Sequence, residues 1–233
     1  MKRLAWSILL DLRIQYRSGY PLWAALAAFL CILAFARIPQ GDSDPLAPLS
    51  SLAFSLCTTL PMVILQALSE KREGTLALLD LTPLRPHEYL TSKAVSLAIP
   101  SLVCNTAMVV ISRGPYFNPI PFWAGVAAAG ILFAFLGFWI AAFARTAGKS
   151  LALGLIAALL LLAPYFPCPG SEPGRLLMAH PLAGPAALIR ASYEPASLLE
   201  WAYGAGASLI WIGIALAACR KAFNRLRSAP RIA

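Results

Sequence analysis

Long stretches of apolar residues, separated by short polar segments, dominate the pattern along this chain. Each stretch approaches the roughly 20 residues that an α-helix needs to cross about 30 Å of hydrocarbon, although the fifth is on the short side. The pattern therefore predicts an all-α membrane protein with six transmembrane helices. We place these helices at Tyr20–Ala36, Leu49–Leu68, Ala94–Ile111, Phe122–Ala144, Leu151–Tyr165 and Trp201–Cys219.

Residues 1–19, ahead of the first stretch, follow a different pattern. Apolar residues there repeat every fourth position, namely Leu4, Ile8, Leu12 and Tyr16. This spacing puts them on one face of a helix, while Arg3, Arg13 and Arg17 can reach lipid headgroups. We therefore expect an amphipathic helix that lies flat at the membrane interface. Asp11 and the length of the basic region argue against a cleaved signal peptide.

The composition fits a membrane protein better than a soluble domain. The chain has 233 residues, of which 59% are hydrophobic and 12% are charged, and its mean hydropathy is +0.71. Soluble domains carry about 25% charged residues. A soluble core of this length could not hide so much apolar surface.

The net charge of +9 comes from basic residues that lie next to the apolar stretches. With six spans, fifteen of the nineteen lysine and arginine residues fall on the side that holds both termini and residues 69–93. The other four are Arg37, Arg113, Arg175 and Arg190. Because basic loops favour the cytoplasmic side, we expect a multi-pass cell-membrane protein with both termini in the cytoplasm. Membrane orientation explains this charge better than nucleic-acid binding, so we expect no nucleic-acid partner.

The reactive residue types form no recognisable catalytic or metal-binding pattern. The five cysteines have no CxxC spacing, and His87 and His180 lie far apart, so we expect no metal site. The "AGKS" at Ala147–Ser150 looks like the end of a P-loop, but the first glycine of that motif would fall on Phe143, inside a span. We therefore expect this chain to bind no ATP and no cofactor.

Few polar residues interrupt the spans, and no charged residue lies near the middle of a span. Proton relays and ion-coupled carriers usually need such charged groups. The uncharged polar residues inside the spans are Thr58, Thr59, Gln66, Asn105 and Thr106. Two interpretations of them stay open: hydrogen bonds between helices, or a lining for the path of a substrate.

Residues 69–93 hold eight of the chain's twenty-nine charged residues. Gly74 is expected to end the second span's helix, and Thr75 to cap a short apolar helix that stops at Pro83. Pro86 suits the first position of the next helix, where Glu88 faces the positive end of the helix dipole. Because an isolated helix this short is marginal in water, it must pack against something. The candidates are the membrane or its own spans, and a groove in a soluble partner.

The segment "EKREGTLALLDLTPLRPHEYLTSK" resembles the region after the second span in type-2 ABC-transporter permeases. The matching positions are Glu70, Glu73, Gly74, Thr75, Leu76, Leu79, Thr82, Pro83, Glu88 and Lys93. His180–Tyr193 is similar to the Pro-containing stretch between the family's last two spans, within an outer loop over residues 166–200. Ala77 departs from the family's frequent Glu, and the loop between the first two spans is short. The resemblance covers residues 1–233 as one permease domain.

The resemblance implies that a separate ABC ATPase subunit, carrying ATP and Mg²⁺, contacts residues 69–93. The implied contact residues are Glu70, Glu73, Gly74, Thr75, Leu76, Leu78, Leu79, Pro83 and Glu88. It further implies an exporter built from a homodimer or heterodimer of permeases in membrane lipid. The apolar walls of the spans suit an amphipathic, drug-like or lipid-like substrate.

Two other functions compete with the permease interpretation. One is a membrane scaffold or regulatory subunit that transports nothing. The other is a membrane-embedded enzyme that uses His180, Tyr193 and Glu194 at the outer face. Co-purification with an ATPase would favour the permease, because neither alternative needs one.

Overall fold

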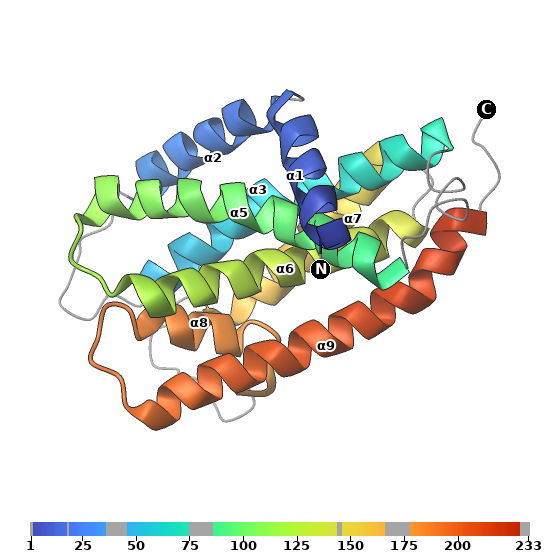
Figure 1. Ribbon diagram of the computed structural model, residues 1–233. Coiled ribbons are helices and arrows are strands. Elements are labelled where there is room, and N and C mark those ends of the chain that lie inside the picture. Colours follow the sequence, from blue (N-terminus) through green and yellow to red (C-terminus); the bar gives the residue numbers. More distant parts are fainter. Residues whose placement is uncertain are drawn as a thin grey trace.

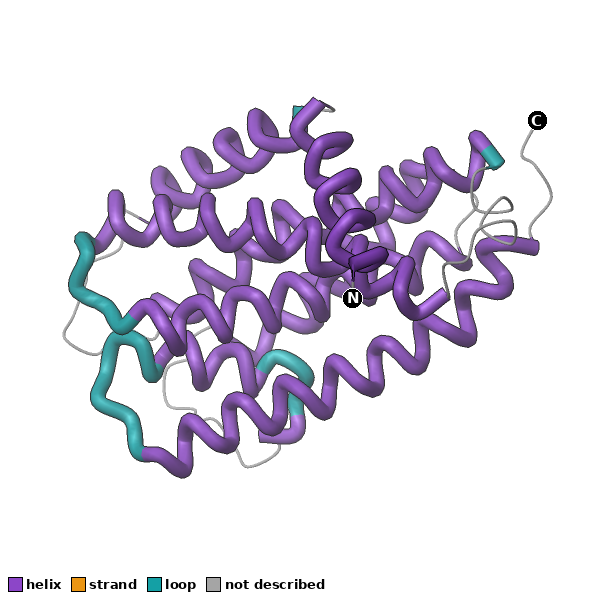
Figure 2. The backbone as a smooth tube through the Cα atoms, viewed as in Figure 1, coloured by secondary structure: helices purple, strands orange, loops and turns teal. Residues whose placement is uncertain are grey.

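The computed structural model describes residues 2–17, 19–35, 46–74, 86–143, 146–165 and 178–228, and every regular element there is a helix (Figures 1 and 2). The all-α prediction is therefore confirmed for the described part of the chain. The helices are α1 (Lys2–Arg17), α2 (Tyr20–Phe35), α3 (Leu46–Glu73), α5 (Pro86–Arg113), α6 (Pro119–Phe143), α7 (Ala147–Leu162), α8 (Ala183–Arg190) and α9 (Leu198–Ser228). A short 3₁₀ turn, η2 (Ala163–Tyr165), continues α7.

Five described helices are long and apolar enough to cross a membrane: α3, α5, α6, α9, and α7 together with η2. The first predicted span corresponds to α2, whose apolar part, Leu22–Leu33, is shorter than the others. Helices α3 and α5 extend well beyond the apolar runs that predicted them, because a helical backbone does not stop where hydrocarbon ends. They stop instead at local signals in the sequence.

Two of those signals are the glycine and the proline named from the sequence. Gly74 follows the last residue of α3 with a φ of 73°, a left-handed conformation that glycine adopts without strain. Helix α5 begins at Pro86, with Glu88 in its first turn. Both predictions are confirmed. Gly19, with a φ of 82°, makes a similar turn between α1 and α2.

Helix α6 lies at the centre of the bundle (Figure 1). It packs against α3, α5, α8 and α9. In its most apolar window 72% of the residues are buried, against 17% for α9 and 22% for α7. The core therefore forms around α6. Most residues of α7 and α9 are not buried inside the bundle.

Helix α8 is the element that the sequence did not predict, since it lies inside the presumed outer loop. It fits between α6 and α9 because glycines remove side chains from the contacts. A Cβ atom added to Gly125 of α6 would lie 2.8 Å from the Pro185 oxygen, and one added to Gly184 of α8 would lie 2.7 Å from the Gly204 oxygen of α9. Because Gly125 and Gly184 carry no side chain, the three helix backbones can approach closely at these positions.

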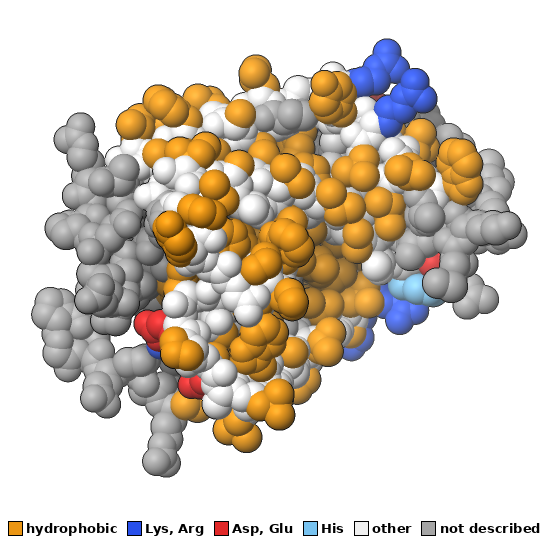
Figure 3. Space-filling model, turned by 60° about the vertical axis from the view of Figure 1, so that its left-hand side comes forward, with side chains coloured by type: hydrophobic (Ala, Val, Ile, Leu, Met, Phe, Trp, Pro, Cys, Tyr) orange, Lys and Arg blue, Asp and Glu red, His pale blue; other side chains and the backbone are white. Residues whose placement is uncertain are grey.

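Large apolar side chains cover much of the surface between the two ends of the bundle (Figure 3). They belong mainly to α2, α7 and α9, for example Leu22, Leu160 and Leu209. Soluble proteins rarely expose so many large apolar side chains on neighbouring helices. Such a surface is expected of helices in contact with hydrocarbon.

Candidate coupling site

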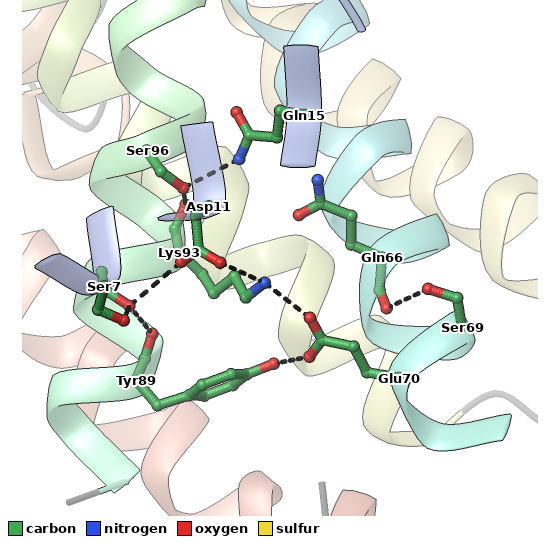
Figure 4. Close-up of polar contacts among 10 residues, drawn as sticks. Ser7, Asp11, Gln15, Gln66, Ser69, Glu70, Tyr89, Lys93 and Ser96 are labelled. Carbon is green, nitrogen blue, oxygen red and sulfur yellow. Dashed lines mark hydrogen bonds and ion pairs between the residues drawn. The ribbon is translucent and has the colours of Figure 1, made fainter. Parts of the chain in front are cut away.

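A cluster of charged and polar side chains lies where α1, α3 and α5 meet (Figure 4). Lys93 of α5 is at its centre. Its ammonium nitrogen lies 2.8 Å from a carboxylate oxygen of Asp11 and 2.6 Å from one of Glu70. The side chains of Lys93 and Asp11 are each only 9% exposed. One lysine thus joins the N-terminal helix to the end of α3.

Tyr89, one turn before Lys93, extends the cluster towards the rest of the bundle. Its hydroxyl donates a hydrogen bond to Glu70. Its ring lies 5.6 Å, centroid to centroid, from Phe223 of α9 and 6.3 Å from Phe138 of α6. Glu70, the first residue of the sequence-matched segment, is therefore held in a position that depends on several helices.

Three residues of α1, namely Ser7, Asp11 and Gln15, make polar contacts with α5. The Ser7 hydroxyl donates to that of Ser92 at 3.2 Å, and the Gln15 side-chain amide donates to the Ser96 hydroxyl at 2.9 Å. The ion pair of Asp11 lies between them. The three α1 residues are spaced four apart, so they form one stripe along the helix. This polar stripe, and not an apolar one, faces the protein.

The outward side of α1 is correspondingly apolar. Trp6 is 73% exposed, and Leu9, Leu10 and Ile14 are exposed as well. Of the apolar stripe named from the sequence, Ile8 and Leu12 are half-buried and Tyr16 is exposed, while the Leu4 side chain lies outside the described part. Helix α1 is thus polar towards the bundle, and apart from Arg13 and Arg17 its described exposed side chains are apolar, the reverse of a helix on a soluble protein.

The charges at this site do not balance. Two carboxylates, Asp11 and Glu70, share the single ammonium of Lys93. Burial raises the pKa of Asp11, and the nearby Lys93 opposes that rise. The Tyr89 hydroxyl donates to Glu70, while the Ser92 hydroxyl lies 3.5 Å from Asp11 and closer, at 3.0 Å, to the Tyr89 carbonyl. Such an arrangement makes the position of Asp11 sensitive to any change in its partners.

Four of the implied ATPase-contact residues are described by the structure, and they lie in or near this cluster. Glu70 is inside it, Glu73 is exposed at the end of α3, Gly74 ends that helix, and Glu88 is half-buried in the first turn of α5. The predicted short helix and its residues fall outside the described residues: Thr75, Leu76, Leu78, Leu79 and Pro83. The structure therefore shows only the residues that flank this segment, Gly74 and Pro86, each about one helical turn from the cluster.

Further along the bundle, buried polar residues connect α3 to α5. Asn105 donates 3.0 Å hydrogen bonds to the Ser51 carbonyl and the Ser55 hydroxyl, and the hydroxyls of Thr58 and Ser101 lie 3.0 Å apart. Thr58 and Asn105 thus take part in interhelical hydrogen bonds.

Three polar atoms among the named path residues lack a hydrogen-bond partner among the described residues. They are Thr59 Oγ1, Gln66 Oε1 and Asn105 Oδ1. Thr59 and Asn105 are fully buried, and the Gln66 side chain points from α3 towards the α1 side of the cluster (Figure 4). Their oxygens can still accept a hydrogen bond, so the substrate-path interpretation of these residues remains a prediction.

The residues of the enzyme alternative lie at the opposite end of the bundle. Tyr193 and Glu194 line an open pocket together with Asn118 and Trp201. His180 is not among the residues that line this pocket. Its ring nitrogen instead accepts the Leu182 backbone amide at 3.3 Å. Within the described part of the chain, the three do not form a nucleophile–base arrangement.

Sequence reasoning identified Glu70 and Lys93 of this cluster but not its other members. It used Asp11 only against a signal peptide, and it gave no role to Tyr89 or to the Ser7 and Gln15 stripe. A signal was available, because Ser7, Asp11 and Gln15 repeat every fourth residue on a helix next to apolar spans. Polar residues with that spacing on such a helix indicate a face that contacts protein.

Comparison with known proteins gives consistent matches. The family model described as fluoroquinolones export permease protein family matches residues 2–228. Two fluoroquinolones export permease proteins of Mycobacterium tuberculosis, from strains CDC 1551 and H37Rv, are each 31% identical over 136 residues. That alignment covers 58% of this chain and 57% of each relative. The aligned part thus spans little more than half the length of these relatives.

Proposed function

The chain belongs to the fluoroquinolones export permease protein family, a family of type-2 ABC permeases, and we propose that it is the membrane subunit of an ATP-driven exporter. A separate ABC ATPase subunit would supply the ATP hydrolysis and hold ATP and Mg²⁺. The family match over residues 2–228 carries this proposal. The apolar helices and the charged cluster beside the sequence-matched segment support it.

In this proposal α2 is the first span along the chain and brings the total to six. A helix of 16 residues can span the membrane where the bilayer thins locally. Helix α1 lies at the interface, with its exposed apolar face in lipid and Arg13 and Arg17 at the headgroups. The permease works as a homodimer or heterodimer. The relatives' names suggest a fluoroquinolone as the substrate.

The substrate path is proposed to run between α3 and α5. Thr58, Thr59, Gln66 and Asn105 would line it. Thr59 and Asn105 support the idea, because each keeps a buried oxygen that accepts no hydrogen bond from the described residues. A movement of α3 relative to α5 would present these oxygens to donors on a drug-like molecule.

The proposed orientation predicts which exposed positions react from outside the cell. In a cysteine-free variant, Tyr116→Cys between α5 and α6 should react with a membrane-impermeant maleimide in intact cells. Lys149→Cys at the start of α7 should react only after the membrane is opened. Both side chains are exposed. The opposite labelling pattern would place the termini outside and overturn the proposed topology.

The proposed ATPase contact predicts that a charge at Leu79 uncouples the transporter. Leu79→Glu would bury a carboxylate in an apolar groove at a cost of several kcal/mol, so the ATPase should no longer co-purify. Substrate-stimulated ATP hydrolysis by the reconstituted pair should be lost with it. Leu198→Glu is the matched control, since it makes the same change at an exposed position at the other end.

The ATPase-contact proposal fails if Leu79→Glu inserts normally, keeps the ATPase and transports like the parent. The scaffold alternative makes a different prediction. It predicts that the parent itself, paired with its ATPase, moves no fluoroquinolone out of cells or vesicles.

A further inference from the structure

Helix α1 is held on the bundle by polar contacts rather than by apolar packing. Most of its large apolar side chains are exposed, Ile8 and Leu12 are only half-buried, and the buried positions among its described side chains are Asp11 and Gln15. The polar contacts of Ser7, Asp11 and Gln15 with α5 are therefore the main attachment that the described side chains provide. An attachment of this kind can be changed by removing one charge.

The α5 side of this attachment is satisfied without α1. The Ser92 hydroxyl lies 3.0 Å from the Tyr89 carbonyl, and the Ser96 hydroxyl lies 2.9 Å from the Lys93 carbonyl. These bonds stay within α5. If α1 moves away, the two serines keep a hydrogen bond and leave no buried polar group stranded.

The charged residues of α3 and α5 also remain paired without α1. With α1 docked, two carboxylates share one ammonium. When Asp11 leaves, Lys93 and Glu70 remain as a balanced pair, still supported by the Tyr89 hydroxyl. Asp11 itself carries its charge to the membrane surface. Both the docked and the undocked arrangement are therefore free of an uncompensated buried cation.

Docking nevertheless changes the surroundings of Glu70. Lys93 divides its interaction between Asp11 and Glu70, and Glu70 lies one helical turn before Gly74. A shift of the Lys93 ammonium towards or away from Asp11 alters the force on the end of α3. The start of the segment that follows Gly74 is thereby tied to the N-terminal helix.

We propose that α1 is a reversible latch, with Asp11 as its positioning residue, and that docked α1 holds the end of α3 where the following segment couples to the ATPase. This inference rests on the proposed function. Asp11 acts through Lys93 and Glu70 and touches no substrate. Loss of its charge should therefore weaken coupling while the ATPase stays bound.

The test combines a charge-removing variant with a covalent lock. Asp11→Asn keeps the shape of the side chain and removes its charge. Ser7→Cys with Ser92→Cys, in a background free of native cysteines, provides the lock, because the two hydroxyl oxygens are 3.2 Å apart and Sγ atoms there can reach disulfide distance. Arg13→Gln is the control, since it removes a charge from an exposed position on the same helix.

We expect Asp11→Asn to lower ciprofloxacin-stimulated ATP hydrolysis about tenfold, the effect of roughly 1.4 kcal/mol, with ATPase co-purification retained. Oxidising the lock should restore the stimulation, and reduction should remove it again. In the chain alone, in liposomes, Asp11→Asn should slow formation of the Ser7→Cys/Ser92→Cys disulfide. Arg13→Gln should change neither measurement.

The latch is overturned if Asp11→Asn keeps full stimulation, or if the oxidised lock fails to restore it. It is likewise overturned if the disulfide forms equally fast with and without Asp11. That last measurement needs no ATPase and no substrate. If the parent binds no ATPase, the proposed function fails while the disulfide rates still decide whether Asp11 docks α1.

Discussion

Lys93→Met is expected to destabilise the protein by about 3–5 kcal/mol, the usual effect of removing one partner from a buried ion pair. Methionine fills a similar volume, so lost packing contributes little. The variant leaves Asp11 and Glu70 buried together without a cation. The free energy of unfolding in detergent, followed by circular dichroism, measures the loss. Lys149→Met, at an exposed lysine, should change it by no more than about 0.5 kcal/mol.

The destabilisation should depend on pH in a defined direction. Burial already raises the pKa of Asp11, and Lys93→Met removes the charge that opposes this rise. A carboxyl whose pKa is higher in the folded state binds protons more tightly there, so stability falls as pH rises above its ordinary value. The variant should therefore lose least at acidic pH. Adding Asp11→Asn and Glu70→Gln should recover most of the stability, because no buried charge then remains.

A buried ion cluster would be contradicted if Lys93→Met had the same free energy of unfolding as the parent. It would also be contradicted if the loss of stability became larger at acidic pH. Either result would mean that water reaches the carboxylates. In that case the contacts between α1 and α5 would be ordinary surface pairs, each contributing about 0–1 kcal/mol.

Gly184→Ala is expected to separate α8 from α9. The added methyl carbon would lie 2.7 Å from the Gly204 carbonyl oxygen and 2.6 Å from the Ser208 hydroxyl. Because the carbonyl belongs to helix backbone, a side-chain rotation cannot relieve the contact. Overpacking of this kind costs about 1–3 kcal/mol, and the rigid partner favours the upper end. A fall in the melting temperature of the detergent-solubilised protein measures it.

Gly206→Ala is the matched control for this prediction. A Cβ atom at Gly206, which lies on α9, meets nothing within 4 Å. It should leave stability unchanged or raise it by up to about 1 kcal/mol, because alanine favours helix more than glycine does. Equal melting temperatures for Gly184→Ala and the parent would show that α8 packs less closely than the described contacts require.

The helices were predictable because each depends on a signal that is local in sequence. An apolar run marks a span, Gly74 ends α3 and Pro86 begins α5. Helix α8 was not predictable in this way. It is only eight residues long, and its burial depends on glycines of α6 and α9 that are distant in sequence. A contact of that kind can be identified only once the positions of α6, α8 and α9 relative to one another are known.

The coupling site was partly predictable for the same reason. Glu70 and Glu88 follow from the family pattern of residues 69–93, and the structure places Glu70 in the ion cluster. Asp11 comes from a helix almost sixty residues earlier, and its pairing with Lys93 depends on how α1 crosses α5. The side of α1 that meets protein also depends on its surroundings, since lipid reverses the usual preference for apolar contact.

The lengths of α3 and α5 have a consequence for access from the aqueous phase. Each has 28 residues, or about 42 Å at 1.5 Å per residue, whereas the hydrocarbon layer is about 30 Å thick. About two helical turns of each are thus available to rise beyond the hydrocarbon. Helix α9, with 31 residues, ends beside them, where Arg220 approaches His87. In the proposed orientation the extra length of α3 and α5 places Gly74 and Pro86 beyond the hydrocarbon, so a water-soluble protein could contact these two helix ends without entering it.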